Sequence, residues 1–384
     1  MQLYTLDSKI RRTEVLDRYE SLIWTERYSE VGDFELEIVS TPQNRALLSI
    51  GTQLALSESD RIMTVETREN NLDSDGRRML KVKGPSLDDT LNERICSGGL
   101  PLGLEPGTWK LTGTPQQIIE QLMYNGLYND PSDAIPYFTN GTLYPAETIP
   151  NDTNVYTIQR PFGNLYETLK ELVDMWELGF RLYRGPDTSK IYFSAYTGND
   201  RTTQQNTLTP VIFSPSLDSL QNVTEYASIA GSKNIVEVRG ELTTVRVYAS
   251  GATADAVNFS RRIIYVDAKD VKGTTTPAIV AELTARGQEE LTKHRTIRAF
   301  DGEVSQNSQY RYNVDYLLGD LVEMRNDDGL TNQMKVTEQI FVSDAEGDRS
   351  YPTLATKLFI TPGSWYSWDT NQVWFDATKT WVTA

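Results

Sequence analysis

An alternating stretch near the start of the chain constrains the fold more than any other feature of this sequence. In residues 33–38 (DFELEI) acidic and apolar residues alternate, and residues 22–28 (LIWTERY) alternate too, with Trp24 and Glu26 on one side. Because successive side chains of a strand point to opposite faces, each run predicts a strand with one side against a core. Gly32 lies between the runs and can take the positive φ that a hairpin turn demands. We therefore predict an antiparallel hairpin.

Further alternating runs predict strands in both halves of the chain. Asp75-Gly76 stands between two such runs, and an Asp-Gly pair in this position is the strongest short-range hairpin signal. A second turn, at 327–329, stands between two late runs. The chain is therefore expected to be mainly β. The runs, in chain order, are residues 51–56, 61–67, 79–83, 319–324 and 334–338.

Three segments carry helix signals instead. The sequence TPQQ at 114–117 combines an N-cap, a first-turn proline and a capping box, and Gly126 is expected to end this helix. Apolar residues at helical spacing predict a second helix at 164–177, capped by Gly179 and followed by two strands. A third helix is predicted to begin at Thr276. The first two helices and the strands after them predict an α+β insert in the β framework.

The two halves of the chain are alike around two glycines. Gly51 begins an alternating run that is followed by M-x-V at 63–65, and Gly319 begins one that is followed by M-x-V at 334–336. The spacing from glycine to methionine differs by three residues, which a turn can absorb. One interpretation is coincidence between two generic hairpins. The other is two related barrels in one chain, so that three chains present six similar barrels.

Composition excludes several classes of protein. A chain of 384 residues is long for one core, so two to four domains are expected. The net charge of −16 argues against a nucleic-acid-binding surface, which needs clustered Lys and Arg. There is no run of about 18 apolar residues for a membrane span and no secretory signal pattern at the N-terminus, so we expect synthesis in a cytoplasm. Cys96 is the only cysteine, so no intrachain disulfide can form, and we expect a buried small apolar side chain.

Five short motifs near both ends of the chain occur in a characteristic order. They are WTERY at 24–28, GDFEL at 32–36, SDRIMTVE at 59–66, KGPSL at 83–87 and YLLGDLV at 316–322. Together they resemble siphophage minor tail proteins of the baseplate-hub type, the family of tail-tip hubs and of the N-terminal region of tail-associated proteins. Members of that family look like trimeric structural hubs that end the tail tube and carry the tip.

The resemblance implies a fold and a division into domains. The expected fold is mainly β with α+β inserts, with two related tail-tube-like β-barrels and peripheral domains in a phage baseplate-hub architecture. The expected parts, in chain order, are a first barrel at 1–95 with a return around 206–240, an α+β insert at 96–205, a peripheral β segment and helix at 241–305, a second barrel at 306–360 and a C-terminal docking segment at 361–384.

The resemblance also implies partners. We expect a homotrimeric ring at the virion tail tip, assembled in the host cytoplasm. The ring would contact the distal tail ring protein or tail tube above it, and a fibre, spike or receptor-binding protein below it. It would adapt six-fold to three-fold symmetry and let DNA pass without specific binding.

No pattern in the sequence predicts catalysis. A nucleophilic triad needs a base beside Ser or Cys, and the only histidine, His294, stands near the end of a predicted helix, where the helix dipole favours a cation. We expect no catalytic residue, no cofactor and no metal site, since turn chemistry explains the aspartates at 73–76 and 327–329. A glycosidase needs only two carboxylates, however, and the chain has 53 Asp and Glu. The alternative function is therefore a carbohydrate-binding or peptidoglycan-cleaving tail-tip protein.

Four tryptophans close to the C-terminus are the candidate binding residues. Their spacing fits neither a strand nor an amphipathic helix, and Pro362-Gly363 breaks the preceding strand. The segment could be a core or subunit-packing strand, a sugar-stacking platform, or a docking segment for another protein. We favour docking on the next tip protein, because polar residues separate the tryptophans and Trp anchors dominate interface hot spots. The residues are Trp365, Trp368, Trp374 and Trp381.

Overall fold

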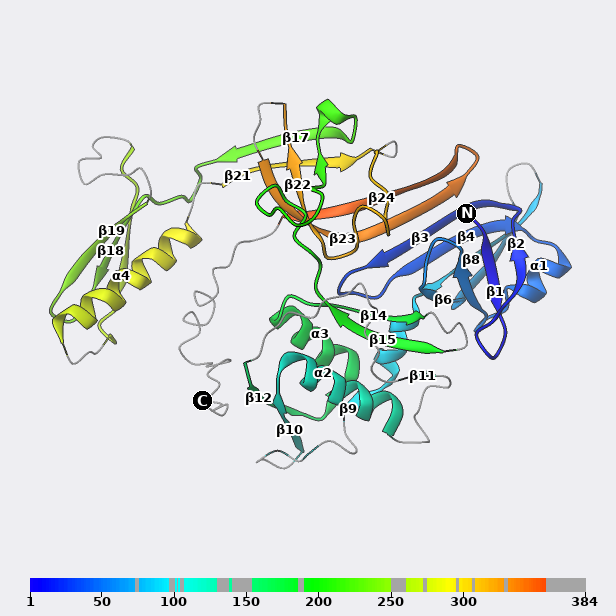
Figure 1. Ribbon diagram of the computed structural model, residues 1–384, viewed down its shortest axis with the longest axis horizontal. Coiled ribbons are helices and arrows are strands. Elements are labelled where there is room, and N and C mark those ends of the chain that lie inside the picture. Colours follow the sequence, from blue (N-terminus) through cyan, green and yellow to red (C-terminus); the bar gives the residue numbers. More distant parts are fainter. Residues whose placement is uncertain are drawn as a thin grey trace. The chain divides into compact units, whose positions relative to one another are not determined.

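The chain divides into two compact units, each of which is described by itself. The first unit is drawn from residues 1–221 and 303–356, and the second from residues 222–302. The finer division into domains stays a prediction. The computed structural model (Figure 1) describes residues 1–72, 76–96, 101, 103, 107–129, 138–139, 154–185, 190–249, 260–271, 275–294, 297–305, 308–327 and 331–356.

A large eight-stranded sheet forms the framework of the first unit. At its centre the predicted hairpin is present: β3 (Tyr19–Arg27) pairs antiparallel with β4 (Asp33–Val39). β3 also pairs antiparallel with β23, so the sheet joins the two halves of the chain (Figure 1). Along the sheet the order is β16 (Ile212–Phe213), β22 (Leu321–Arg325), β23 (Thr331–Asp344), β3, β4, β8 (Arg78–Pro85) and β7 (Thr67–Leu72), with β24 (Gly347–Thr356) paired to β23.

One face of this sheet is apolar because the strands alternate as the sequence predicts. Trp24 faces Phe34 across the β3–β4 pair, with ring centroids 6.1 Å apart, and both rings are buried. They pack with Val82 and Phe341 from the neighbouring strands. A four-stranded sheet contributes to the same core. Its order is β2 (Arg12–Leu16), β1 (Leu3–Leu6), β5 (Gln53–Leu56) and β6 (Ile62–Thr64), and the short helix α1 (Pro42–Leu47) precedes β5.

The α+β insert has its own apolar core. Its helices are α2 (Pro115–Tyr124), with the predicted Thr114 capping box, and α3 (Leu165–Met175), with Asn164 as N-cap. The core also takes in Leu87 and Leu91 from the framework side. The remaining elements of the first unit are η1 (Leu87–Glu93), β9 (Ile95–Cys96), β10 (Thr108–Gly113), η2 (Asn125–Asn129), β11 (Phe138–Thr139), β12 (Tyr156–Pro161), β13 (Gly163–Asn164), β14 (Gly179–Arg184), β15 (Ile191–Tyr196) and η3 (Pro215–Leu217).

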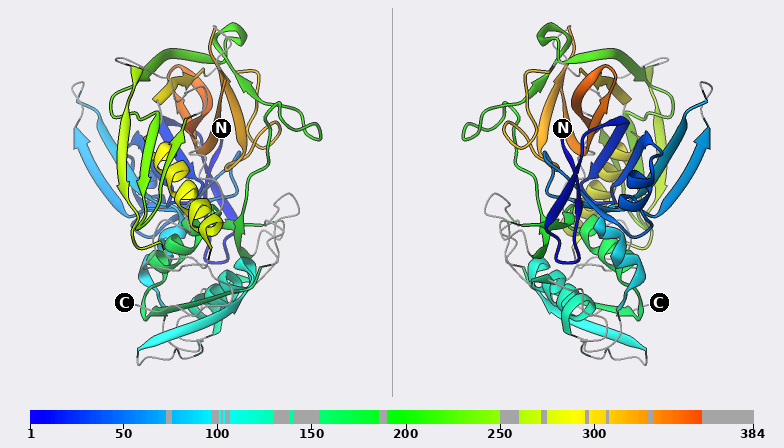
Figure 2. Two further views of the ribbon diagram at one scale, coloured as in Figure 1. Left: turned by 90° about the vertical axis from the view of Figure 1, so that its left-hand side faces the viewer. Right: turned by 90° about the vertical axis from the view of Figure 1, so that its right-hand side faces the viewer.

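The second unit is a small α/β layer. Helix α4 (Thr276–Lys293) packs on the sheet of β19 (Thr244–Tyr248), β18 (Ile235–Arg239) and β20 (Ile263–Asp267), as Figure 2 shows. Gly287 lies inside α4 and permits close packing on the sheet, because an added Cβ would come within 2.3 Å of the Val247 side chain. A two-stranded ribbon of β17 (Leu220–Ser228) and β21 (Ile297–Val304) connects the units in sequence.

Three glycines have roles other than those predicted. Gly32 does not have a positive φ; instead an added Cβ would lie 2.5 Å from the Thr25 carbonyl oxygen, so this glycine permits a close approach. Gly179 does not cap α3 but begins β14, where a Cβ would meet the Tyr28 ring at 2.3 Å. Gly126 follows the end of α2 at Tyr124 and lies in a π-helical turn, where an added Cβ would come within 2.5 Å of the Leu165 side chain. The predictions for Gly32 and Gly179 were wrong because a local turn signal cannot reveal a tertiary contact.

The fold class is confirmed as mainly β, but the described residues do not show the two predicted closed barrels. In the part of the chain that the structure describes, every sheet is open and ends in an edge strand.

Candidate functional site

The two hairpins that begin at Gly51 and Gly319 have the same local geometry. Gly51 has φ +84° and Gly319 has φ +88°. Gly51 donates its N–H to the carbonyl of Val65, and Gly319 donates to the carbonyl of Val336, both at 2.8 Å. Val65 and Val336 each donate an N–H back to the residue after the glycine, both at 2.9 Å. Only glycine takes this backbone conformation without strain.

The correspondence continues strand by strand. Leu54 faces Met63 in the first hairpin, and Val322 faces Met334 in the second. After its methionine, each hairpin strand pairs with a further strand, β8 in the first hairpin and β24 in the second. Over the same length it contains one residue more than that strand, which is a β-bulge. The chain advances four residues from Met63 to Thr67 while the partner moves three, from Ser86 to Lys83. It advances four from Met334 to Glu338 while the partner moves three, from Thr356 to Thr353.

This shared bulge favours a true internal repeat over a coincidence of generic hairpins. Bulges are specific structural features, and two unrelated hairpins have no reason to carry one at the same offset from a positive-φ glycine. The surroundings differ, because β5 and β6 lie in the four-stranded sheet, whereas β22 and β23 lie in the eight-stranded one. The repeat therefore holds for the hairpins and their register.

The exposed side of β3, β4 and β8 is a charged face, defined by Arg27, Asp33, Glu35, Lys81 and Lys83 together with Glu338 of β23. Arg27 pairs with Asp33 at 2.5 Å and with Glu338 at 2.7 Å. Lys83 pairs with Glu35 at 2.7 Å, and Lys81 pairs with the same carboxylate. Each basic side chain on this face of the three strands is thus neutralised by a carboxylate.

The electrostatics of Glu35 agree with this pairing. Partial burial alone would raise the pKa of the Glu35 carboxyl, but hydrogen bonds from Lys81 and Lys83 outweigh it and hold that pKa below its ordinary value. Glu35 is therefore ionised at neutral pH, and the two lysines are held by it rather than offered to a phosphate.

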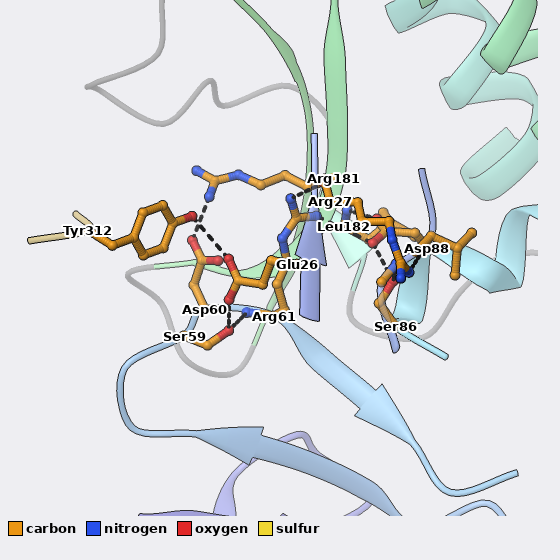
Figure 3. Close-up of polar contacts among 12 residues, drawn as sticks. Glu26, Arg27, Ser59, Asp60, Arg61, Ser86, Asp88, Arg181, Leu182 and Tyr312 are labelled. Atoms are coloured by element: carbon orange, nitrogen blue, oxygen red, sulfur yellow. Dashed lines mark hydrogen bonds and ion pairs between the residues drawn. The ribbon is translucent and has the colours of Figure 1, made fainter. Parts of the chain in front are cut away.

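A buried polar network lies at the junction of β3 with the insert (Figure 3). Arg61 and Asp88 form an ion pair at 3.3 Å, and both side chains are 2% exposed. The Asp88 carboxylate also accepts hydrogen bonds from Ser86 Oγ at 2.7 Å and from the backbone N–H of Leu182. Asp88 therefore connects η1 to β14 of the insert. Removing one partner of such a pair leaves a buried charge without compensation.

Glu26 is the second centre of this network. Its carboxylate accepts hydrogen bonds from Ser59 Oγ and, at 3.0 Å, from the Tyr312 hydroxyl. Burial raises the pKa of the Glu26 carboxyl, and Arg61 only partly opposes this. Figure 3 shows Ser59 and Tyr312 converging on Glu26 from different segments of the chain. Glu26 thus links the first half of the chain to the segment that precedes Gly319.

The position of Glu26 in the sequence is a signal for this network. Glu26 shares a strand side with Leu22 and Trp24, and an acid on the apolar side of a strand must find partners when it is buried. Its partners could not be predicted, because Ser59 and Tyr312 are 33 and 286 residues away in the chain.

Comparison with known families identifies the chain. A family model described as Siphovirus ReqiPepy6 Gp37-like protein matches residues 1–353. The chain belongs to this family. It is a siphovirus tail protein, which confirms the resemblance carried by the five motifs. A comparison with curated proteins finds no match.

Solved structures similar to this siphovirus tail protein include two tail proteins and a type VI secretion component. The prophage MuSo2 43 kDa tail protein from Shewanella oneidensis has 12% identity and a TM-score of 0.48, covering 92% of this chain and 97% of that one. A tail protein from Neisseria meningitidis MC58 has the same identity and TM-score, covering 92% and 95%. The E. coli c3393 protein, a type VI secretion component described as similar to T4 tail proteins gp27 and gp5, has 10% identity, a TM-score of 0.45 and coverage of 94% and 78%. At TM-scores below 0.5 these likenesses carry no weight for function.

Cys96 and His294, the residues considered for nucleophilic chemistry, both lie among the described residues. In the siphovirus tail protein Cys96 is buried on β9, and burial raises the pKa of its thiol to about 11. It is a small apolar core residue, as predicted. His294 is the C-cap of α4, as predicted, with its Nε2 3.7 Å from the Glu290 carboxylate. The docking candidates Trp365, Trp368, Trp374 and Trp381 lie outside the described residues.

A further pocket of the siphovirus tail protein is lined by charged side chains. This pocket of about 400 Å³ is lined by Asp60, Arg181, Arg201 and Asp320, among others, and these charges pair within it as Arg181–Asp60 at 3.0 Å and Arg201–Asp320 at 2.7 Å. Among the described residues, no group of three His, Cys, Asp or Glu side chains could hold a metal ion. Across the same ranges, no helix is long and apolar enough to cross a membrane.

Proposed function

We propose that this siphovirus tail protein is the structural hub of the tail tip and works as a homotrimeric ring. The observation that carries the proposal is the shared geometry of the Gly51 and Gly319 hairpins. A chain with two equivalent hairpins gives a trimer six equivalent positions. A six-fold tail tube or distal tail ring can then meet the upper side of the ring, while a three-fold tip meets the lower side.

The charged face of β3, β4 and β8 is suited to border the DNA path. A lumen that passes a polyanion must not hold it, and phosphate contacts by free Lys and Arg would do so. On this face Arg27, Lys81 and Lys83 are each paired with carboxylates. The net charge of −16 agrees with this role.

The lower side of the ring would recruit the fibre, spike or receptor-binding protein. The proposed docking residues are the four C-terminal tryptophans, Trp365, Trp368, Trp374 and Trp381. Large aromatic anchors on a polar segment bury their area by docking on a partner. In this account the protein is not an enzyme, and the carbohydrate-binding or carbohydrate-cleaving alternative stays a prediction of the sequence.

The oligomeric mass of the purified protein tests the proposal. Native mass spectrometry should give three times the chain mass of 43.4 kDa. Electron micrographs of the same sample should show a ring with three-fold symmetry. A monomer under all conditions, or a ring of another order, would contradict the proposed hub.

A further inference from the structure

The large sheet has an unpartnered edge at β7. β7 pairs with β8 on one side, and no described strand pairs with its other side. The strand is largely exposed, and Leu72 at its end is 67% exposed. An open edge of this kind presents a row of free N–H and C=O groups that can pair with another strand.

The internal repeat shows what β7 lacks. Since Met63 corresponds to Met334, Thr67 corresponds to Glu338, and β7 corresponds to the second part of β23. That part of β23 has β24 on one edge and β3 on the other, with Glu338 facing Arg27 and Gln339 facing Glu26. β8 is the counterpart of β24. The missing neighbour of β7 is therefore a counterpart of β3.

The counterpart of β3 in the second half of the chain is β17. β3 pairs with the next strand, β4, ahead of the Gly51 hairpin, and β17 pairs with β21 ahead of the Gly319 hairpin. The sequences agree: LIWTE at 22–26 matches LQNVTE at 220–225, with Asn222 as the extra residue. Asn222 has φ +51°, the left-handed conformation that the first residue of a G1-type bulge adopts.

β17 also lacks a neighbour. It pairs with β21 alone among the strands that the structure describes, and a two-stranded ribbon is marginally stable by itself. Within one chain, then, β7 and β17 are both edge strands, and neither is the other's partner.

We propose that β7 of one copy pairs antiparallel with β17 of a second copy, in the register of the β23–β3 pair. This rests on the proposed trimer and names its interface. The register places Thr67 opposite Tyr226, Arg68 opposite Glu225 and Glu69 opposite Thr224. The contact joins two different surfaces, so it can be repeated from copy to copy, and in the proposed trimer it closes after three copies.

Charge and packing favour a second copy of this chain as the source of the strand that pairs with β7. The register places Arg68 directly opposite Glu225, and opposite charges across a strand pair attract. At Gly319 the end of β3 covers the glycine, with the Tyr28 ring 2.2 Å from an added Cβ. At Gly51 an added Cβ would have no heavy atom within 4 Å. The uncovered Gly51 fits a β3 counterpart that arrives from another copy.

Engineered disulfides test the strand register. Cys96 is buried with a raised pKa, so it does not compete with introduced cysteines. The double variants Glu69→Cys with Thr224→Cys, and Thr67→Cys with Tyr226→Cys, should form a covalent trimer on oxidation. The matched control, Asn71→Cys with Tyr226→Cys, uses the same strands four residues out of register, at about 13 Å, and should stay unlinked.

A charge exchange gives a second readout that needs no oxidation. Arg68→Glu places like charges opposite each other and should raise the protein concentration at half-trimerisation by about fivefold or more. Adding Glu225→Arg should restore the original value. A native trimer in which neither in-register pair cross-links, and in which the charge exchange has no effect, overturns this interface but leaves the proposed hub standing. A protein that is monomeric throughout contradicts both.

Discussion

The aromatic ring of Tyr28 covers Gly319. An added Cβ on Gly319 would lie 2.2 Å from Tyr28 Cε2, and the Tyr28 hydroxyl donates to backbone carbonyls of Glu177 and Tyr196, at 3.0 and 3.1 Å. The end of β3, the repeated hairpin of the second half and the insert therefore meet at one side chain. A glycine is needed at position 319 for two reasons. Its backbone has a positive φ, and the Tyr28 ring leaves no room for a side chain.

The repeat supplies a matched pair of glycine substitutions. Gly51→Ala and Gly319→Ala both force alanine into positive φ, at about 1–2 kcal/mol each. Only Gly319→Ala also clashes with the Tyr28 ring, so its total loss of unfolding free energy should be about 3 kcal/mol or more. Urea unfolding of the full chain measures the loss of unfolding free energy in each variant. Equal losses for the two variants would mean that the Tyr28 contact does not matter.

Much of the framework could be predicted from the sequence, because local patterns carry it. Period-two alternation marked β3 and β4, and the capping box at Thr114 marked α2. The order of strands in the large sheet could not be predicted, since β3 pairs with β23 more than 300 residues away. The hydrogen-bond partners of Glu26 and the close contacts of Gly32 and Gly179 could not be predicted for the same reason. They depend on which distant segments of the chain the fold brings together.

The buried carboxyl of Glu26 should make stability fall as the pH rises. Burial raises its pKa above the ordinary value of 4.5, so the folded state favours the neutral acid. That contribution is complete below the ordinary pKa and is lost as the pH rises through the folded-state pKa. Glu26→Gln cannot ionise, so its stability relative to the wild type should increase between about pH 4 and pH 7 in denaturant unfolding.

Glu35→Gln is the control for this pH dependence. The pKa of Glu35 is lowered, so its stabilising contribution is present above the ordinary pKa and lost as the pH falls. The stability of this variant relative to the wild type should therefore decrease as the pH rises through the folded-state pKa to about 4.5, and should then stay level up to pH 7. The same trend in both variants would contradict the assignment of opposite pKa shifts.

The charged face predicts weak interaction with DNA. The wild-type protein should not form a tight, salt-sensitive complex with duplex DNA at about 150 mM salt. Glu35→Gln releases Lys81 and Lys83 from their carboxylate and should increase binding at low salt, measured by fluorescence anisotropy. Glu171→Gln removes the carboxylate paired with Arg160 on the insert and serves as the control. Tight binding by the wild type would exclude this face as a passive lining.

The C-terminal tryptophans predict a separable docking step. A chain truncated after Thr361 should remain a soluble, folded trimer and should fail to recruit the next tail-tip protein. Each aromatic anchor at a packed interface can contribute about 2 kcal/mol or more, so the loss of recruitment should be complete. Pull-down of tip components from an assembly extract measures this. A truncated chain that neither folds nor trimerises would assign the tryptophans to the hub itself.

The central claim is that one chain carries two equivalent hairpins so that three chains imitate a six-fold ring. The most direct measurement is the native mass of the purified full chain, combined with a low-resolution electron microscopy image of the same sample. The account predicts a homotrimer that appears as a three-fold ring with six similar densities around an open or plugged centre. A stable monomer, or a ring with any other number of chains, would contradict it.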